Sequence, residues 1–282
     1  MPPPATLLVD NGSLQPAATL ALRELATKLG GRLRRPVEPV SLLHSSGINP
    51  ALLAGRPAEI LFPALERRLA EGQSDFRLVP LFFGPSQALT VYLPENIDRL
   101  RKKFPALRVA LAPQLHASDD HRLALILADQ VRAEIAAVSR ASSLAAGSTG
   151  QIRVALVDHG SPVKPVTAVR NELARQLADQ LGSLVAAVSP CSMERRPDPA
   201  YDFCDPLLAA LLATPPWTES TVIVAMQFLL PGRHAGPQGD VAEICRAAET
   251  AHPGLRTVMT TLVAEHPLLI DILADRWRAA TD

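Results

Sequence analysis

The sequence lacks the features that mark membrane proteins, nucleic-acid-binding proteins and nucleotide-dependent enzymes. Its 282 residues carry 28 basic and 28 acidic side chains with no long basic run, so nucleic acid is not an expected partner. No apolar stretch approaches the roughly 18 residues that a membrane span requires. No Gly-x-x-x-x-Gly-Lys loop is present, so we expect no nucleotide cofactor.

Cysteine is also scarce. The three cysteines, Cys191, Cys204 and Cys245, form no Cys-x-x-Cys pair, which argues against a zinc knuckle or a redox motif. We expect them to be buried free thiols. The opening residues, Met1–Pro4, lack the charged and apolar regions of a signal peptide, and a cytoplasmic location is therefore expected.

The sequence does contain one segment in two similar copies. Residues 7–13 read Leu-Leu-Val-Asp-Asn-Gly-Ser, and residues 155–161, at a spacing of 148, read Ala-Leu-Val-Asp-His-Gly-Ser. The same spacing relates residues 24–26 to 172–174 and residues 40–41 to 188–189. A spacing repeated along the chain predicts a tandem duplication. The length and the 48% hydrophobic content suffice for two separate cores.

Each half alternates short β-rich runs with amphipathic helices, which predicts a parallel sheet covered on both faces. We therefore predict an α/β protein of two similar doubly wound parallel-sheet domains, residues 1–139 and 151–282, joined by a small polar linker at 140–150. The predicted strands are 6–10, 37–43, 76–83, 108–112, 152–158, 184–189, 221–230 and 255–260. The predicted helices are 16–29, 58–71, 94–103, 120–138, 166–181, 204–213, 239–250 and 266–279.

Three potential metal ligands follow consecutive predicted strands of the second half. They are His159, Glu194 and His234. Ligands of open parallel sheets bind beyond the carboxyl ends of the strands, so we expect these side chains to meet at one edge. Two imidazoles and one carboxylate suit a first-row divalent metal with positions left open for a substrate.

A simpler interpretation exists for each of these residues. A single histidine after a strand is commonly a loop residue, and Glu194 could be a solvated carboxylate paired with Arg195 or Arg196. The duplication favours the metal interpretation, because the first half has Asn11 where the second has His159, and an amide is a poor metal ligand and a poor base. The remaining histidines are expected to be structural or surface residues: His44, His116, His121, His252 and His266.

Cationic side chains lie on the same predicted loops. They are Lys164, Arg195, Arg196 and Arg233. Guanidinium groups bind carboxylates through paired hydrogen bonds, so these residues predict a polycarboxylate ligand; ordinary solvation of charged loops is the alternative. The turn at Gly160 and Ser161 could add backbone N–H groups for an anion.

The second half resembles the sirohydrochlorin chelatases, the ATP-independent tetrapyrrole chelatases of cobalamin and sirohaem biosynthesis. Two motifs carry the resemblance: a strand ending in His-Gly-Ser at residues 159–161, and an apolar strand running into Pro-Gly-Arg-His at residues 231–234. The resemblance implies two similar α/β domains with the active site in the cleft between them. It implies that His159 and His234 bind the metal and handle the pyrrole protons. Glu194 is similar in position to an acidic ligand of the family.

The first half resembles a degenerate copy. Asn11 replaces the first histidine, and residues 84–88, Gly-Pro-Ser-Gln-Ala, replace Pro-Gly-Arg-His. The counterpart of His234 is then Ser86, Gln87 or Ala88, and at the main spacing Ser46 faces Glu194. One active site per chain is expected, in the second half.

The sequence therefore predicts a chelatase that inserts Co²⁺ or Fe²⁺, with Ni²⁺ also open, into sirohydrochlorin or a related tetrapyrrole. The same nitrogen and oxygen ligands serve all three metals, so their types do not select one. Two alternatives remain: a protein that carries a tetrapyrrole or a metal without catalysis, and a partner subunit with a structural role. We expect a monomer if the protein is a chelatase or a carrier.

Overall fold

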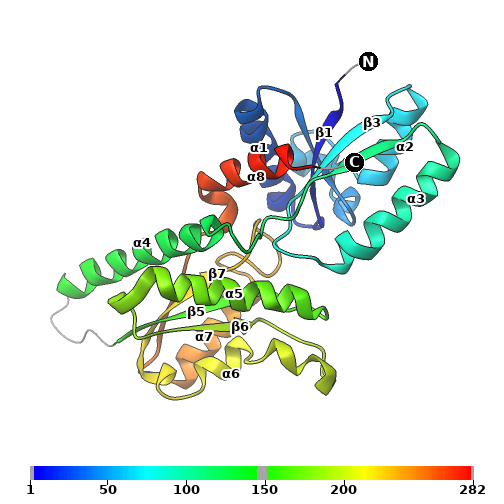
Figure 1. The fold of residues 1–282 in the computed structure, drawn as a ribbon. Coiled ribbons are helices and arrows are strands. Elements are labelled where there is room, and N and C mark those ends of the chain that lie inside the picture. The colour runs from blue at the N-terminus through cyan, green and yellow to red at the C-terminus, as the bar shows by residue number, and fades with distance from the viewer. Residues whose placement is uncertain (1–2, 145–150, 281–282) are drawn as a thin grey trace. The chain divides into compact units, whose positions relative to one another are not determined.

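The computed structural model describes residues 3–144 and 151–280, which form two four-stranded parallel sheets with helices packed against them (Figure 1). The strand orders are β2-β1-β3-β4 and β6-β5-β7-β8, which confirms the predicted α/β class with two similar parallel-sheet folds. The strands are β1 Ala5–Asp10, β2 Val37–Ser41, β3 Asp75–Pro80, β4 Arg108–Leu111, β5 Ile152–Asp158, β6 Ala187–Ser192, β7 Thr221–Met226 and β8 Arg256–Met259. The helices are α1 Pro16–Leu33, α2 Leu61–Ala70, α3 Leu93–Lys103, α4 Arg122–Leu144, α5 Lys164–Leu181, α6 Leu208–Leu212, α7 Asp240–Ala251 and α8 Leu268–Arg278.

The central strands owe their burial to uninterrupted apolar runs. In β7, residues 222–226 are fully buried, as expected for an inner strand of a sheet covered on both faces. The helices that follow β1 and β5 each have a proline in the first turn, Pro16 and Pro165, where its missing N–H leaves no hydrogen bond unmade. These two strand–helix junctions define the loops that contain Asn11 and His159.

One predicted strand is wrong in position. The strand predicted at 184–189 lies at Ala187–Ser192, because α5 is followed by a short 3₁₀ turn at Gly182–Leu184. The predicted linker at 140–150 also starts as helix, since α4 continues to Leu144, and residues 145–150 lie outside the described residues.

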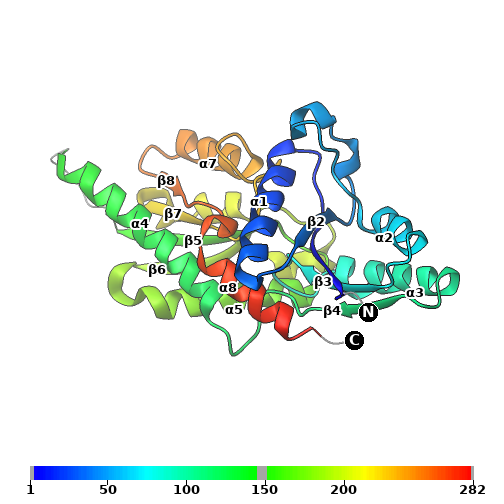
Figure 2. The same cartoon turned by 90° about the horizontal axis from the view of Figure 1, so that it is seen from above.

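The chain forms two compact units that do not follow the duplicated halves. The first unit comprises residues 1–117, 230–232 and 267–282, and the second comprises 118–229 and 233–266. Helix α8 therefore packs in the first unit, beside α1 (Figure 2), where Trp277 Nε1 donates to Thr6 Oγ1 at 3.1 Å. Helix α4 packs in the second unit, where Gln130 Nε2 donates to the carbonyl of Leu262 at 2.9 Å. The last helix of each half thus completes the unit built on the other half's sheet.

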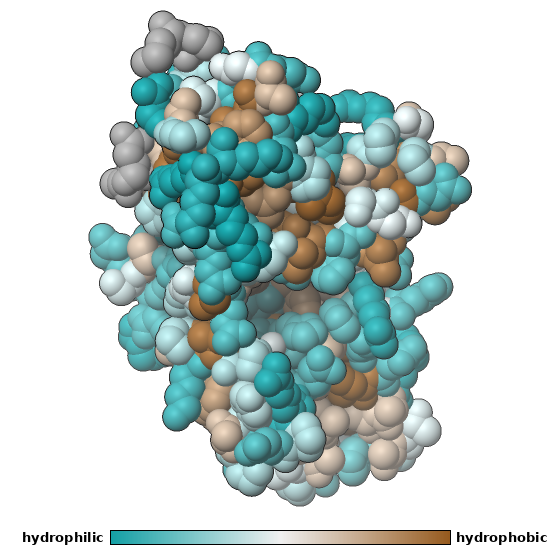
Figure 3. Space-filling model, turned by 90° about the vertical axis from the view of Figure 1, so that its right-hand side faces the viewer, coloured by the Kyte–Doolittle hydropathy of each residue, from teal (hydrophilic) through white to brown (hydrophobic). Residues whose placement is uncertain are grey.

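Each unit has its own apolar core. The core of the first unit centres on Leu7, Phe76 and Leu78, and that of the second on Val157 and Val224, all nearly or fully buried. At the surface, hydrophobic residues come in patches among hydrophilic ones, as Figure 3 shows for one face. Among the described residues, no helix combines the length and the apolar character needed to cross a bilayer.

The strand registers correct the alignment of the two halves. Asp10 pairs with Ser41 and Asp158 pairs with Ser192, so Ser41 corresponds to Ser192 and not to Ser189. The next backbone contacts extend this register. Leu43 N donates to Asn11 O, and Glu194 N donates to His159 O, both at 3.2 Å. The residue at the position of Glu194 is therefore Leu43, and the expected match with Ser46 is wrong.

The third strands of the two sheets, β3 and β7, identify the residue that corresponds to His234. Leu81 N donates to Val9 O, and Gln227 N donates to Val157 O, so Leu81 and Gln227 correspond. Counting the same number of residues along each chain segment places Ala88 opposite His234. Of the three residues that the sequence left open, the register selects Ala88.

Candidate metal site

The site in the second unit begins at a tight turn after β5. Gly160 has a φ of +94°, and a Cβ added there would lie 1.9 Å from the carbonyl oxygen of Glu194. Only glycine permits both this backbone conformation and this approach. The turn therefore brings His159 next to Glu194, the second residue after β6.

His159 and His234 lie face to edge. Their ring centroids are 4.6 Å apart and their planes differ by 70°. One metal ion with bonds of about 2 Å to each of two imidazole nitrogens separates those nitrogens by up to about 4 Å. The spacing of the two rings is comparable with that span. The structure thus brings together the two histidines that the sequence singled out.

Hydrogen bonds assign the proton of each ring to Nδ1. His234 Nδ1 lies 2.6 Å from Asp240 Oδ2, and His159 Nδ1 lies 3.0 Å from the carbonyl oxygen of Gly160. A carboxylate and a carbonyl can only accept, so both Nδ1 atoms donate. In the neutral rings, Nε2 then carries the lone pair, which is the arrangement by which metal-binding histidines are oriented.

Glu194 completes the group on the His159 side. Its Oε1 lies 3.4 Å from His159 Nε2, and its side chain is 61% exposed. Among residues 3–144 and 151–280, no three His, Cys, Asp or Glu side chains are already gathered as a metal site. The three predicted ligands are therefore neighbours at one strand edge, and the carboxylate lies on the solvent side.

A buried ionic cluster supports the turn from below. Asp158, the last residue of β5, accepts from Ser192 Oγ at 2.6 Å and from Gly160 N at 3.1 Å. Arg170 of α5 is 1% exposed; it donates to Ser192 Oγ at 2.6 Å and lies 3.8 Å from Asp158. Burial raises the pKa of the Asp158 carboxyl, and these two neighbours counter the rise.

The predicted cationic residues lie around the site with different partners. Arg195 is held by Asp205 at 2.9 Å and Asp202 at 3.0 Å, and Arg196 donates to the Tyr201 hydroxyl at 3.0 Å. The simpler interpretation of Glu194, a pair with Arg195 or Arg196, is not what the structure shows.

The other predicted contact residues lie on the neighbouring loops. Lys164 Nζ lies 5.7 Å from the centre of the Phe203 ring. Ser161 Oγ accepts from Val163 N at 3.1 Å. Arg233 is 78% exposed, and its Nε lies 3.7 Å from Asp240.

The cysteines do not contribute ligands to this group. All three are buried free thiols, as predicted. Burial raises the pKa values of the Cys191 and Cys245 thiols, which disfavours the thiolate that a metal would need.

Sequence reasoning missed three residues of the site: Asp158, Arg170 and Asp240. The first is repeated as Asp10 in the other half, a signal that its role is common to both turns. Asp240 starts α7 and follows His234 by six residues. No periodicity marks its contact, which arises because the intervening loop folds the helix start back onto the imidazole.

Comparisons with known proteins agree with this fold. The model of the CbiX family matches residues 153–280. SirB from Bacillus subtilis with Fe³⁺ has 16% sequence identity and a TM-score of 0.68, covering 97% of this chain and 94% of that one. The cobalt complex of the sirohydrochlorin chelatase SirB from Bacillus subtilis subspecies spizizenii gives the same identity and TM-score, with coverages of 97% and 93%.

A third structure is described as CbiX, the terminal enzyme for biosynthesis of sirohaem in denitrifying bacteria. It has 17% identity and a TM-score of 0.56, and the match covers 99% of this chain and 100% of that one. No curated protein sequence matches the chain significantly. The family match confirms the resemblance inferred from the two histidine motifs: residues 153–280 match the CbiX family model, and the chain as a whole has the fold of the sirohydrochlorin chelatase SirB.

Proposed function

We propose that this protein is an ATP-independent chelatase that inserts a divalent metal, Co²⁺ or Fe²⁺, into sirohydrochlorin or a related tetrapyrrole. The observation that carries the proposal is the pair of imidazoles, 4.6 Å apart, with both Nδ1 atoms engaged and both Nε2 atoms left as ligands. The family match of the second half supports it. Ni²⁺ fits the same nitrogen and oxygen ligands.

In this proposal the metal is a substrate, held by Nε2 of His159 and His234 and by the Glu194 carboxylate. Few, partly exposed ligands suit an ion that must leave with the product. Glu194 is 61% exposed and His159 is 47% exposed. The ligands must hold the ion less tightly than the four nitrogens of the macrocycle do.

Two pyrrole N–H protons leave as the metal enters the macrocycle. An imidazole Nε2 that releases the metal can accept one of them. The resulting imidazolium of His234 would be stabilised by the Asp240 carboxylate at 2.6 Å, and that of His159 by Glu194 at 3.4 Å. The net change is exchange of one divalent ion for two protons, which requires no nucleotide.

The carboxylates of the tetrapyrrole would be bound by the surrounding cations. Arg233, Arg196 and Lys164 are the proposed contacts, with the backbone turn at Ser161. Arg195 is already held by two aspartates, so within this set it keeps the loop after β6 in place as well as adding positive charge.

Turnover separates the enzyme from a carrier with the same histidines. The protein is mixed with excess sirohydrochlorin and Co²⁺, Fe²⁺ or Ni²⁺ in turn, and product absorbance is followed. A chelatase converts many equivalents of tetrapyrrole per chain. A carrier stops at about one equivalent, and that result would replace the proposed function with the carrier alternative.

A further inference from the structure

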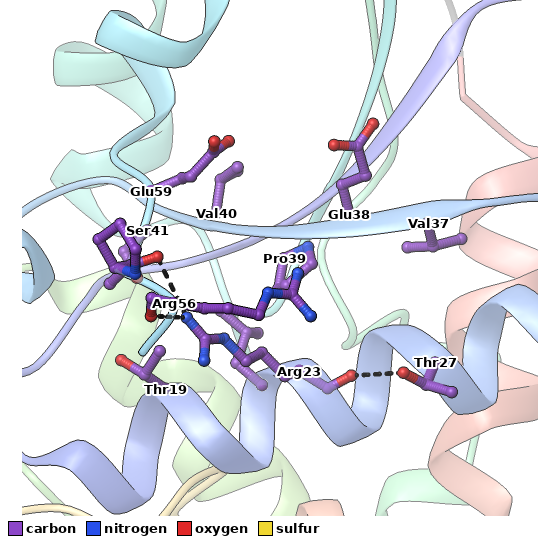
Figure 4. Close-up of a pocket in the computed structure, with 13 residues that line it drawn as sticks. Thr19, Arg23, Thr27, Val37, Glu38, Pro39, Val40, Ser41, Arg56 and Glu59 are labelled. Carbon is purple, nitrogen blue, oxygen red and sulfur yellow. Dashed lines mark hydrogen bonds between the residues drawn. The ribbon is translucent and has the colours of Figure 1, made fainter. Parts of the chain in front are cut away.

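The first unit contains a cavity of about 360 Å³ between α1 and the edge strand β2 (Figure 4). Thr19 and Leu22 of α1 and Ser41 of β2 are among the residues that line it. Arg23 of α1 and Arg56 of the loop before α2 also line it. None of these residues belongs to the candidate metal site.

The second unit shows why this space is open. At the repeat spacing of 148, Leu22 corresponds to Arg170. The buried Arg170 side chain bridges Ser192 and the carbonyl of Cys204, at 2.6 and 2.7 Å. Leu22 cannot make these contacts, and Ser41, the counterpart of Ser192, instead accepts from Ser45 Oγ at 2.9 Å.

Thr19 also lacks a contact that its counterpart in the second unit makes. Its counterpart, Thr167, lies with Oγ1 3.9 Å from Cys204 Sγ. Thr19 is 5% exposed, and its Oγ1 has no hydrogen-bond partner. A buried hydroxyl without a partner is costly, and here it belongs to a residue that lines a cavity.

Two guanidinium groups lie on the α1 side of β2. Arg23 is fixed by three backbone carbonyls, donating from Nη1 to Leu53 at 3.0 Å and from Nη2 to Arg56 at 2.6 Å and to Pro57 at 3.1 Å. Burial, and then the nearby charge of Arg56, lower the pKa of Arg23. The lining thus holds two like charges without an acidic partner on their own side of the strand.

The two carboxylates that line the cavity are engaged elsewhere. Glu38 and Glu59 project from the opposite side of β2 in Figure 4. Glu59 lies 2.8 Å from Arg67 and 3.3 Å from Arg68. Glu38 lies 2.5 Å from Arg68. Because these acids are paired with other arginines, they leave the charges of Arg23 and Arg56 uncompensated.

We propose that this cavity binds a small oxyanion, a carboxylate or phosphate group, between the guanidinium groups of Arg23 and Arg56. The guanidinium fork of Arg56 matches the paired oxygens of both groups. Arg23, whose Nη2 already donates to two carbonyls, would contribute its charge and the N–H groups of Nε and Nη1 that those contacts leave. The volume lies at the lower end of the range for small-molecule sites, so the oxyanion can belong to a small metabolite. This site is independent of the proposed chelatase activity.

Calorimetric titration of the whole chain with inorganic phosphate, and separately with citrate, tests the proposal. Sodium chloride at matched ionic strength is the control for screening. The wild type is expected to bind one anion at this site, and the tighter of the two titrants identifies phosphate or carboxylate as the preferred group. Heats equal to those of the chloride control would overturn the proposal.

Two variants assign the binding to this cavity. Arg56→Gln removes an exposed guanidinium and is expected to weaken binding at least about tenfold. Thr27→Glu, at an exposed position one helical turn after Arg23, places a competing carboxylate at the rim and is expected to abolish binding. Arg99→Gln, on the exposed face of α3, is the matched control and should bind as the wild type does. Undiminished binding by both Arg56→Gln and Thr27→Glu would contradict the assignment.

Discussion

The two units share the same strand-end turn but not the same side chains above it. Gly12 and Gly160 have φ values of +90° and +94°, and each would bring an added Cβ within 2 Å of a backbone carbonyl oxygen, that of Leu43 or of Glu194. The side chains at the three site positions are His159, Glu194 and His234 in one unit, and Asn11, Leu43 and Ala88 in the other. Both units therefore have the same backbone turn, while the proposed metal ligands are present in one.

The difference extends below the turn. Asp158 is supported by Ser192 and Arg170, whereas Oδ1 of Asp10 has no hydrogen-bond partner. The first unit thus keeps the buried carboxylate without the buried arginine. The two units thus share the turn but differ in the side chains that follow the three strands, and the proposed metal chemistry depends on those side chains.

The largest expected effect is on the rate of metal insertion, and it should be seen at His159 and His234 but not at Asn11. His159→Ala or His234→Ala should lower the initial rate of metal insertion by at least about a hundredfold, because each removes a metal ligand and a proton acceptor. Asn11→Ala should leave the rate near wild type. Melting temperatures check folding, which should be retained since these are loop positions. An Asn11→Ala rate as low as that of His234→Ala would place the first unit in the catalytic centre.

A variant of the first unit tests whether the shared turn alone is enough to bind a metal. Asn11→His should create no second metal site, because Leu43 and Ala88 supply no further ligands. Equilibrium dialysis with Co²⁺ should give the same number of ions per chain as the wild type. One additional ion per chain would show that the backbone frame alone is enough.

A smaller effect is expected at Asp240, which orients His234. Asp240→Asn should weaken Co²⁺ binding by about tenfold to a hundredfold, the usual effect of losing a partner that orients a ligand. Glu243→Gln is the matched control, since it removes another acid from the first turn of α7. Co²⁺ titrations followed by calorimetry distinguish the two variants. Equal affinities for both would mean that the 2.6 Å contact does not orient the ring.

The paired glycines should show equal costs in stability and unequal costs in function. Gly160→Ala and Gly12→Ala each combine a positive φ with a backbone clash, so each should destabilise its unit by more than the roughly 1–3 kcal/mol of backbone strain alone. Only Gly160→Ala should also weaken Co²⁺ binding. Gly55→Ala isolates the strain, because Gly55 has a φ of +76° with no atom near an added Cβ. Denaturant unfolding gives the stabilities. A milder effect of Gly160→Ala than of Gly55→Ala would argue against the close approach to Glu194.

The last prediction concerns Asp10, the buried carboxylate that has no arginine beside it. Burial raises the pKa of Asp10 to about 6 from its ordinary 3.8, against the opposing hydrogen bond from Ser41. A raised folded-state pKa favours the protonated form, so this contribution is full below about pH 4 and is lost as pH rises through 6. Asp10→Asn should therefore stabilise the first unit at pH 7 by up to about 3 kcal/mol, and the gain should vanish near pH 4.

Urea unfolding followed by Trp277 fluorescence in a Trp217→Phe background reports on the first unit. Asp98→Asn, an exposed carboxylate of α3 at 67%, is the control and should show no comparable gain. Destabilisation of the first unit by Asp10→Asn at pH 7 would mean that the ionised carboxylate is needed by the fold.

The parts of the molecule predicted from sequence are those encoded in short segments. The turn at residues 159–161 and the loop ending at His234 were predicted because each is contiguous with its strand. The second strand of the second half was misplaced because its apolar run starts inside a 3₁₀ turn at Gly182–Leu184 that local composition does not distinguish from a strand. Separately, the two-residue match of 40–41 with 188–189 gave a repeat spacing that is three residues off at this strand, as the pairing of Asp158 with Ser192 shows.

Contacts between distant segments could not be predicted from the sequence. The amphipathic stripes of α4 and α8 predict helices but not which sheet each covers, and the helices pack in the units of the opposite halves. The contact of Asp240 with His234 depends on the path of a loop containing Gly236 and Gly239. Both features arise from tertiary packing, which periodicity does not encode.

A crystal structure of the Co²⁺-soaked protein, with anomalous scattering at the cobalt edge, tests directly whether each chain has one metal site built on two oriented imidazoles. We expect one strong cobalt peak per chain, about 2.0–2.2 Å from Nε2 of both His159 and His234, with Nδ1 of His234 still bonded to Asp240. A peak bound through Nδ1, a peak beside Asn11, or no peak between the two rings would contradict it.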